Sequence, residues 1–211
     1  MTPGPSEPVY KNCIAFIDGQ NLFYAIKSAF GYSHPNYDVQ LLAKAICQQQ
    51  NWDLLKVCFY TGIPPKNINP KWHDFWAKKL AVMGTRQITT FKRELRYHQE
   101  YIELPGGGTK SVLVPREKGI DIRIALDIVR MASDEEYDVA LLFSQDQDLS
   151  EVAREIRRIS NKQNRWIKIA CAYPISPTTT NDRGINSTDW IKFDKSFYDR
   201  CIDPIDYRIF Q

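Results

Sequence analysis

Two aspartates directly follow an unbroken apolar run and have the type and spacing to bind a cation or activate water. The run is VALLF (residues 139–143), and the polar segment after it contains Asp146 and Asp148. Such a run indicates a strand buried on both faces of a parallel sheet, and open α/β sheets bind ligands at the carboxyl ends of their strands. For this segment alone a simpler interpretation is equally open, in which Ser144 or Asp146 caps a helix over residues 148–159.

Two further carboxylates occupy comparable places in the chain. Asp18 ends the apolar run of residues 12–17, and Asp121 lies in the first turn of an expected helix. The carboxyl ends of parallel strands meet at one edge, so we expect Asp18, Asp146 and Asp148 to converge there, with Asp121 arriving from its helix start. Four carboxylates without matching cations repel one another. The set therefore predicts a hard divalent cation with oxygen ligands, Mg²⁺ or Mn²⁺.

A bound Mg²⁺ or Mn²⁺ would support hydrolysis of a phosphodiester by lowering the pKa of water and stabilising charge on the leaving oxygen. Asn21 could position a phosphate or a metal-bound water through its amide. Lys118 could contact the scissile phosphate as a point charge, unless it is only an exposed lysine at a helix start. Asp127 lies six residues after Asp121, roughly 240° around a helix, so Asp121 is the preferred ligand of the two.

The apolar patterns predict a framework of alternating strands and helices that would position these side chains. We expect an α/β fold with three layers, α/β/α, around a mainly parallel sheet. In the helix expected over residues 70–83, Trp72, Phe75 and Trp76 recur at helical spacing, which favours core packing over a stacking platform for bases. Residues 176–188 are rich in hydroxyls and amides and indicate a mobile loop. The expected strands are residues 12–17, 54–60, 87–91, 139–143, 166–173 and 190–193; the other expected helices are 21–30, 39–49 and 117–131.

The 211 residues fit a single domain over residues 10–211 after a flexible leader, residues 1–9. No run of about 18 apolar residues exists, and the first residues lack a basic segment and an apolar core, so we expect a cytoplasmic protein without a membrane partner. A homo-oligomer is compatible with the sequence. The five cysteines form no CxxC pair and the three histidines show no ligand spacing, which argues against zinc and for buried thiols in a reducing compartment.

The net charge of +3 is concentrated between residues 86 and 118, which hold seven basic and four acidic side chains. Residues 101–104 and 109–114 alternate around a glycine-rich turn, which predicts a β-hairpin inserted at about residues 92–114. A basic hairpin beside an acidic site suits a polyanionic substrate, although a merely solvated hairpin explains the charge equally well. The basic residues expected to hold phosphates are Arg86, Lys92, Arg93, Arg96, Lys110 and Arg116.

Three segments together resemble the NYN domain family, the LabA-like or DUF88 group of PIN-like nucleases. These are FIDGQN (residues 16–21), KGIDIRIALD (residues 118–127) and LLFSQDQDLS (residues 141–150). The resemblance implies a PIN-like α/β/α fold and a metal-dependent ribonuclease site. Carried over by position, the acidic residues are Asp18, Asp121, Asp146 and Asp148, with Asn21 alongside and Lys118 and Asp127 as further residues of the family motifs.

One motif departs from the family pattern. The family's usual Ser-Gly-Asp-Ser-Asp-Phe is Ser-Gln-Asp-Gln-Asp-Leu in this chain, and we expect Gln145 to narrow the opening of the metal site.

Our leading hypothesis is a Mg²⁺- or Mn²⁺-dependent endoribonuclease acting on single-stranded or structured RNA. The alternative is an RNA-binding or regulatory module with a weak or silent site. A haloacid-dehalogenase-type phosphatase ranks low because position 20 is Gln, and a toprim-type site lacks a well-placed Glu. Dinucleotide binding is disfavoured, since no GxGxxG follows the first strand.

Overall fold

A six-stranded parallel sheet forms the centre of the molecule, as the sequence predicts. The structure is a computed structural model that describes residues 5–103, 107–116 and 118–208. The strand order is β3-β2-β1-β6-β7-β8, and every neighbouring pair is parallel. Because β1 and β6 are neighbours, the two motifs that follow them lie at the same edge of the sheet. The strands are β1 (Asn12–Asp18), β2 (Asp53–Ile63), β3 (Thr89–Glu94), β6 (Val139–Phe143), β7 (Lys168–Pro174) and β8 (Asp189–Phe193).

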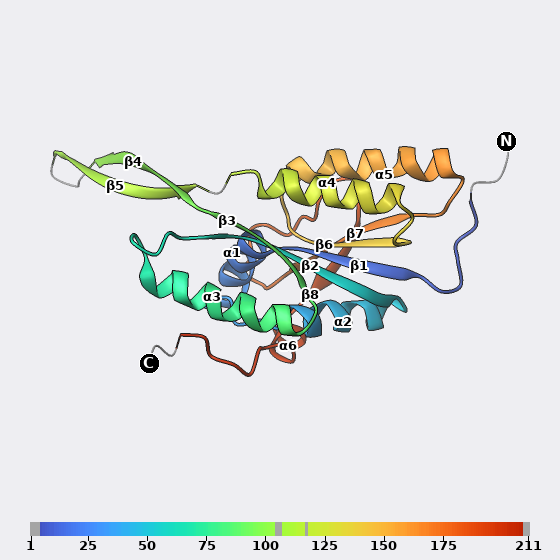
Figure 1. The fold of residues 1–211 in the computed structure, drawn as a ribbon, viewed down its shortest axis with the longest axis horizontal. Helices are drawn as coiled ribbons and strands as arrows, with labels where there is room; N and C mark the ends of the chain where they lie inside the picture. The colour runs from blue at the N-terminus through green and yellow to red at the C-terminus, as the bar shows by residue number, and fades with distance from the viewer. Residues whose placement is uncertain (1–4, 104–106, 117, 209–211) are drawn as a thin grey trace.

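Helices cover both faces of this sheet and complete three layers (Figure 1). On one face pack α4 (Ile120–Ser133) and α5 (Ser150–Gln163). On the other face pack α1 (Gly19–Phe30), α2 (Val39–Gln50), α3 (Pro70–Thr85) and the short α6 (Lys195–Asp199). The predicted α/β/α architecture is therefore confirmed. A 3₁₀ turn, η1 (Gln147–Leu149), precedes α5, so the single helix expected from residue 148 is divided in two.

The two faces of the central strands feed two separate apolar cores. In β1, Ala15 and Ile17 pack under α1 and α2, whereas Ile14 and Phe16 pack under α4 and α5. Successive side chains of a strand point to opposite faces, so a strand covered on both sides must be apolar at every position. This is why the runs in β1 and β6 are continuous. On α3, Phe75 and Trp76 are buried in the first core, which confirms the expected packing.

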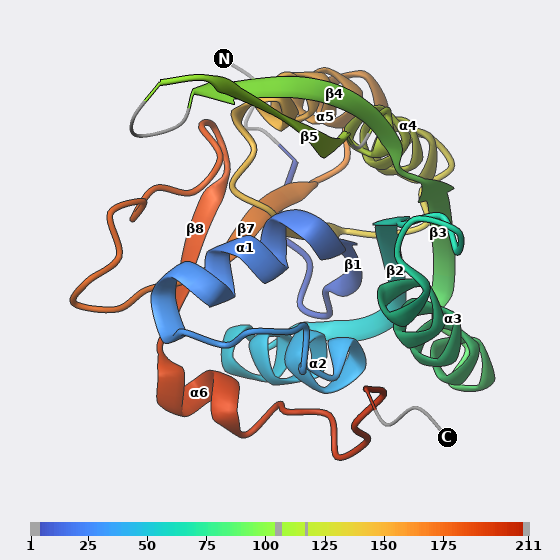
Figure 2. The same ribbon diagram turned by 90° about the vertical axis from the view of Figure 1, so that its left-hand side faces the viewer.

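A separate antiparallel hairpin projects beyond the carboxyl edge of the sheet (Figure 1). Its strands are β4 (Arg96–Glu103) and β5 (Thr109–Arg116), longer than the sequence pattern indicates. Lys92 and Arg93 belong to β3 and pair with β2, so the hairpin begins at Arg96 and not near residue 92. In Figure 2 the hairpin arches across from the side of β3 and α4 toward the side of β8. Residues 104–106 of its turn, Glu117 and residues 1–4 of the expected leader lie outside the described residues.

A buried ion pair joins the segment after α6 to α3. The ammonium group of Lys79 lies 3.2 Å from a carboxylate oxygen of Asp203, and both side chains are almost fully buried. Lys79 also donates to the carbonyl of Tyr37 at 2.8 Å, and Tyr207 donates to Asp203 at 2.9 Å. These contacts fix the end of the described chain against the layer that carries α1.

The cysteine side chains lie in the interior of the protein, as the sequence predicts. All five cysteines are buried and none is disulfide-bonded. Within residues 5–103, 107–116 and 118–208, no helix is both long enough and apolar enough to cross a membrane.

Candidate acidic site at the carboxyl edge

Asp18 lies where β1 becomes α1, with only 7% of the residue exposed. Its side chain caps the helix by accepting from the backbone N–H groups of Gln20 and Asn21, at 3.2 and 3.0 Å. Burial raises the pKa of Asp18 to about 6; the charges of nearby Asp146 and Asp121 add to the increase, and the two N–H donors oppose it. Capping and a chemical role are therefore compatible in this residue.

The tight turn at Asp18 requires a glycine at the next position. A Cβ atom on Gly19 would overlap the ring of Phe59 and lie 3.0 Å from the carbonyl oxygen of Tyr60. Tyr37 further fixes this turn, because its hydroxyl donates to the carbonyl of Gly19 at 3.0 Å. The position of the Asp18 carboxylate is thus set by β2 and by the loop before α2.

The structure brings Asp146 and Asp121 near Asp18 but leaves the side chain of Asp148 on the surface. Asp146 caps η1 by accepting from the N–H of Asp148 at 3.0 Å, and its own N–H donates to Ser144 Oγ at 3.2 Å. Asp121 comes from the first turn of α4. Since the charges of Asp146 and Asp121 both raise the pKa of Asp18, three of the four predicted carboxylates form one electrostatic cluster.

The carboxylates of this cluster do not enclose a metal ion on their own. In the described parts of the chain, no three His, Cys, Asp or Glu side chains are gathered closely enough to hold a metal ion by themselves. The donors are nevertheless all carboxylate oxygens, the ligands that Mg²⁺ prefers, and Mg²⁺ usually keeps several waters and uses only one or two carboxylates. The residues therefore fit an ion that is bound partly through water and substrate phosphate.

Asn21 and Lys118 hold the backbone around the cluster. The side-chain oxygen of Asn21 accepts from the N–H of Gln145 at 2.8 Å, which fixes the turn after β6 to α1. The carbonyl of Lys118 accepts from Arg93 Nη1 at 3.1 Å, and the lysine itself is exposed. The next residue, Gly119, has φ 76°, and a Cβ there would lie 2.8 Å from Arg93 Nη1, so this motif position also needs glycine.

Asp127 has a structural environment distinct from that of Asp121. It is buried and accepts from the hydroxyl of Tyr60 and from Nε of Arg123, each at 2.9 Å. A carboxylate satisfied by two donors inside the α4 layer joins that helix to β2. The sequence argument that Asp121 and Asp127 do not share a helix face agrees with this placement.

Most of these residues lie in a segment that matches one protein family. The family model described as the NYN domain matches residues 13–166. The chain belongs to the NYN domain family. This is a family of PIN-like nucleases, and the match contains the acidic cluster, the hairpin and both glycine positions. The NYN match ends before β7, although β7 and β8 complete the sheet.

The other similarities of this NYN protein concern its fold alone. No curated protein matches its sequence. A solved protein of unknown function from Vibrio parahaemolyticus is 20% identical, with a TM-score of 0.52, over 91% of this chain and 99% of that one. MurG of Acinetobacter baumannii is 10% identical with a TM-score of 0.34, over 86% of this chain and 45% of that one, which is too weak to support an argument.

The two glutamines that depart from the NYN motif bind the loop between β7 and β8, residues 175–188. The amide nitrogens of Gln145 and Gln147 donate to backbone carbonyls of this loop, and Gln147 Oε1 accepts a backbone N–H. Gln145 thus contacts a loop that the sequence indicates as mobile, and the narrowing of the metal site by this side chain stays a prediction. The loop partners are Asn181, Arg183 and Gly184 through their carbonyls and Asn186 through its N–H, at 2.8–3.1 Å.

Replacing both glutamines with the family's residues, Gln145→Gly with Gln147→Ser, is expected to release this loop. Each lost hydrogen bond costs about 0.5–1.5 kcal/mol, so amide hydrogen exchange within residues 176–188 should accelerate about tenfold or more. Mass-spectrometric hydrogen exchange measures this, with Gln49→Ser at an exposed position of α2 as the matched control. Unchanged exchange in the loop would show that the glutamines do not restrain it.

The base of the hairpin forms a basic hollow of about 450 Å³ beside the start of α4. Arg93 is close to it, stacked on the ring of Phe91, whereas Lys110 is exposed farther along β5. The hollow is a concave cationic surface only three residues from Asp121 along the chain. Its lining residues are Arg96, Tyr97, His98, Arg116 and Lys118.

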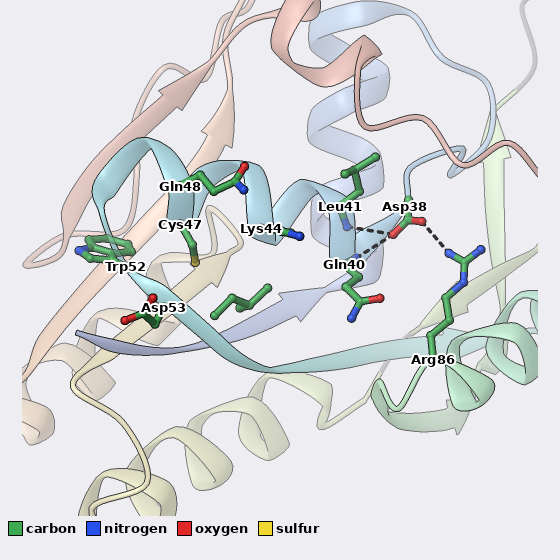
Figure 3. A pocket seen from close by; sticks show the side chains of 10 residues that line it. Asp38, Gln40, Leu41, Lys44, Cys47, Gln48, Trp52, Asp53 and Arg86 are labelled. Atoms are coloured by element: carbon green, nitrogen blue, oxygen red, sulfur yellow. Dashed lines mark hydrogen bonds and ion pairs between the residues drawn. The ribbon is translucent and has the colours of Figure 1, made fainter. Parts of the chain in front are cut away.

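Arg86 does not join this surface. It follows α3 and precedes the amino end of β3, and its guanidinium forms an ion pair of 2.6 Å with Asp38, the cap of α2. Figure 3 shows this pair at the wall of a separate cavity formed with α2 and the start of β2. The structure thus separates Arg86 from the other basic residues that the sequence groups with it.

Proposed function

We propose that this NYN protein is a Mg²⁺- or Mn²⁺-dependent endoribonuclease. The observation that carries the proposal is the cluster at the carboxyl edge, where the buried Asp18 lies within reach of the charges of Asp146 and Asp121. A buried carboxylate next to two others favours a cation that offsets their repulsion. Membership in a family of PIN-like nucleases supports phosphodiester hydrolysis as the reaction.

The residues take distinct roles in this proposal. A bound divalent ion would acidify a water molecule and stabilise charge on the leaving oxygen. Asp18 and Asp146 would hold such an ion, and Asp121, in the first turn of α4, adds negative charge beside them. Asn21 acts as a positioning residue, because its amide oxygen fixes the turn that carries Asp146. Asp148, whose side chain is exposed, would add negative charge at the edge of the site.

The basic hollow is the proposed binding site for the RNA backbone. Arg96, Arg116 and Lys118 line it and offer charge to phosphate groups without reading the base sequence. Lys92, Arg93 and Lys110 extend the positive charge along β3 and β5. Because this attraction is electrostatic, RNA affinity should fall steeply as salt is raised.

The direct test is RNA cleavage by the purified protein with controlled metal. Labelled single-stranded and hairpin RNAs are expected to be cut internally with Mg²⁺ or Mn²⁺, to stay intact with EDTA, and to be cut again when excess metal is restored. Gel electrophoresis of the products measures this. Cleavage that persists in EDTA would contradict the proposal.

A second candidate is an RNA-binding module with a silent site. It is favoured by the openness of the carboxylate cluster and by the departure of Gln145 and Gln147 from the family motif. Its expected result is salt-sensitive RNA binding, reduced by Arg96→Ala, without cleavage at any metal concentration.

A further inference from the structure

The two ends of the hairpin insertion touch at its root. Arg93 lies near the end of β3, just before the hairpin, whereas Lys118 and Gly119 follow the hairpin and precede α4. Nη1 of Arg93 donates to the carbonyl of Lys118 at 3.1 Å, which joins residues that are 25 positions apart in the chain. We call this hydrogen bond the root contact. It ties the turn before α4 to the edge strand of the sheet.

The turn before α4 needs such support, because no side chain of the described residues caps this helix. Gly119 occupies the cap position and has no side chain to accept from the first turn. The helices α1, α2 and α3 instead begin after Asp18, Asp38 and Asn69, whose side chains accept N–H groups of their first turns. A helix start without an acceptor is less stable than a capped one. Burial of Ile120 anchors the first turn in the core, and the root contact holds the chain that enters it.

Arg93 is itself held in place on two sides, although it is exposed. Its backbone pairs with Gly62 of β2, and its guanidinium lies 5.6 Å from the centre of the Phe91 ring. The guanidinium of Arg123, from α4, lies 5.0 Å from the centre of the same ring. An arginine that is stacked on an aromatic ring loses less conformational freedom when it donates a hydrogen bond. Arg93 is therefore a fixed donor to the carbonyl of Lys118.

The guanidinium of Arg93 packs directly against the backbone of Gly119. This glycine has φ 76°, and a Cβ atom on it would lie 2.8 Å from Nη1 of Arg93. Asp121 is only two residues farther along the chain, in the first turn of α4, and its charge acts on Asp18. A displacement of the turn at Gly119 would therefore move the carboxylate of Asp121 relative to the acidic cluster.

We propose that Arg93 is a positioning residue of the acidic site. Through the root contact it holds the turn before α4 and thereby keeps Asp121 beside Asp18, where the divalent ion of the proposed function would bind. This role differs from the phosphate contact that the sequence predicts for Arg93, because it acts on the metal site and not on the RNA. The inference rests on the proposed function for its metal and requires no further ligand.

Arg93→Ala and Lys92→Ala form a matched pair that tests this role. Lys92 is the exposed neighbour of Arg93 in β3, so both variants remove one positive charge from the same strand. RNA affinity in EDTA, measured by fluorescence anisotropy, should fall by a similar factor in both. The Mn²⁺ concentration that gives half-maximal RNA cleavage should rise about fivefold in Arg93→Ala, as loss of one hydrogen bond predicts, and stay unchanged in Lys92→Ala.

Amide hydrogen exchange in EDTA gives a readout that needs neither metal nor RNA. In Arg93→Ala, exchange within residues 119–124 should accelerate about fivefold or more, whereas exchange in α5 should keep its wild-type rate. Lys92→Ala should match wild type in both segments. A general loss of stability would instead lower the melting temperature and accelerate exchange in α4 and α5 together, with no change in the half-maximal Mn²⁺ concentration. That result, or equal Mn²⁺ dependence of the two variants, would overturn the inference.

A double variant shows whether Arg93 acts through the turn at Gly119. Gly119→Ala places a Cβ atom against the guanidinium, so it should also raise the half-maximal Mn²⁺ concentration. If both residues act through the root contact, Arg93→Ala combined with Gly119→Ala should raise this concentration no further than Gly119→Ala alone. Effects of independent sites would multiply in the double variant, and that outcome would count against the inference.

The wild-type protein separates this inference from the proposed function. Metal-dependent cleavage by wild type with an unaltered Mn²⁺ dependence in Arg93→Ala would reject the role of Arg93 and retain the nuclease. Absence of cleavage at any metal concentration, together with faster exchange at the start of α4 in Arg93→Ala, would reject the nuclease and retain Arg93 as the residue that holds Asp121.

Discussion

Asp146→Asn and Asp18→Asn are each expected to reduce metal-dependent RNA cleavage about a hundredfold or more while leaving the fold intact. A ligand that loses its charge binds a hard cation weakly, and metal stabilisation of the transition state is worth several kcal/mol. Both aspartates also cap helical turns, at η1 and α1. Asn caps helices about as well as Asp, so the free energy of unfolding should change by no more than about 1 kcal/mol. Measured kcat/KM and thermal unfolding distinguish the two effects.

A matched control and a second readout sharpen this prediction. Asp53→Asn removes an exposed carboxylate from the opposite, amino end of the same sheet and should keep full activity. Mn²⁺ should raise the melting temperature of wild type and of Asp53→Asn, because a ligand that binds only the folded state stabilises it. The rise should be absent in Asp18→Asn. Wild-type cleavage by either Asp18→Asn or Asp146→Asn would contradict the assignment of the site.

Lys79→Ala is expected to destabilise the protein by about 3–5 kcal/mol. Removing one partner of a buried ion pair leaves the other charge without compensation, here Asp203. The variant also loses the hydrogen bond to the carbonyl of Tyr37, whose hydroxyl holds the turn after Asp18. Urea unfolding followed by circular dichroism measures the change. Because the loop before α2 loosens, the metal-induced rise in melting temperature should also shrink.

Two comparisons identify the buried charge as the cause. Lys71→Ala, at an exposed position of the same helix, should change the stability by less than about 0.5 kcal/mol. Lys79→Met combined with Asp203→Asn should be less destabilising than Lys79→Ala, because no uncompensated charge stays buried. A loss in Lys79→Ala no larger than that in Lys71→Ala would show that the pair contributes little.

The sequence predicts the sheet, and the edge of the sheet at which the acidic site lies, because both depend on local patterns. Continuous apolar runs mark β1 and β6 as strands covered on two faces, and a carboxylate at the end of each fixes the acidic edge. The alternation of strands and helices predicts a mainly parallel sheet but does not give the order of all its strands. Side-chain direction within a turn does not follow at all: Asp146 turns inward as a cap, whereas Asp148, two residues later, faces solvent.

Contacts between distant segments account for what the sequence does not predict. Arg86 is close in sequence to Arg93, but it lies at the end of α3. Its guanidinium therefore pairs with Asp38, the cap of α2. Gln145 differs from the family residue in a way that only the position of the β7–β8 loop explains. A cavity between α1, α3 and the hairpin likewise combines residues from three distant segments, so no single stretch of sequence indicates it.

The hairpin is hydrogen-bonded as its own two-stranded sheet, apart from the six strands of the core. Its length and charge can therefore change during evolution without altering the register of any core strand. Under the proposed function, exchanging this one insertion would change the RNA target while the carboxylate edge stays the same. Replacing the hairpin by a different one is thus a route to new binding preferences on an unchanged sheet.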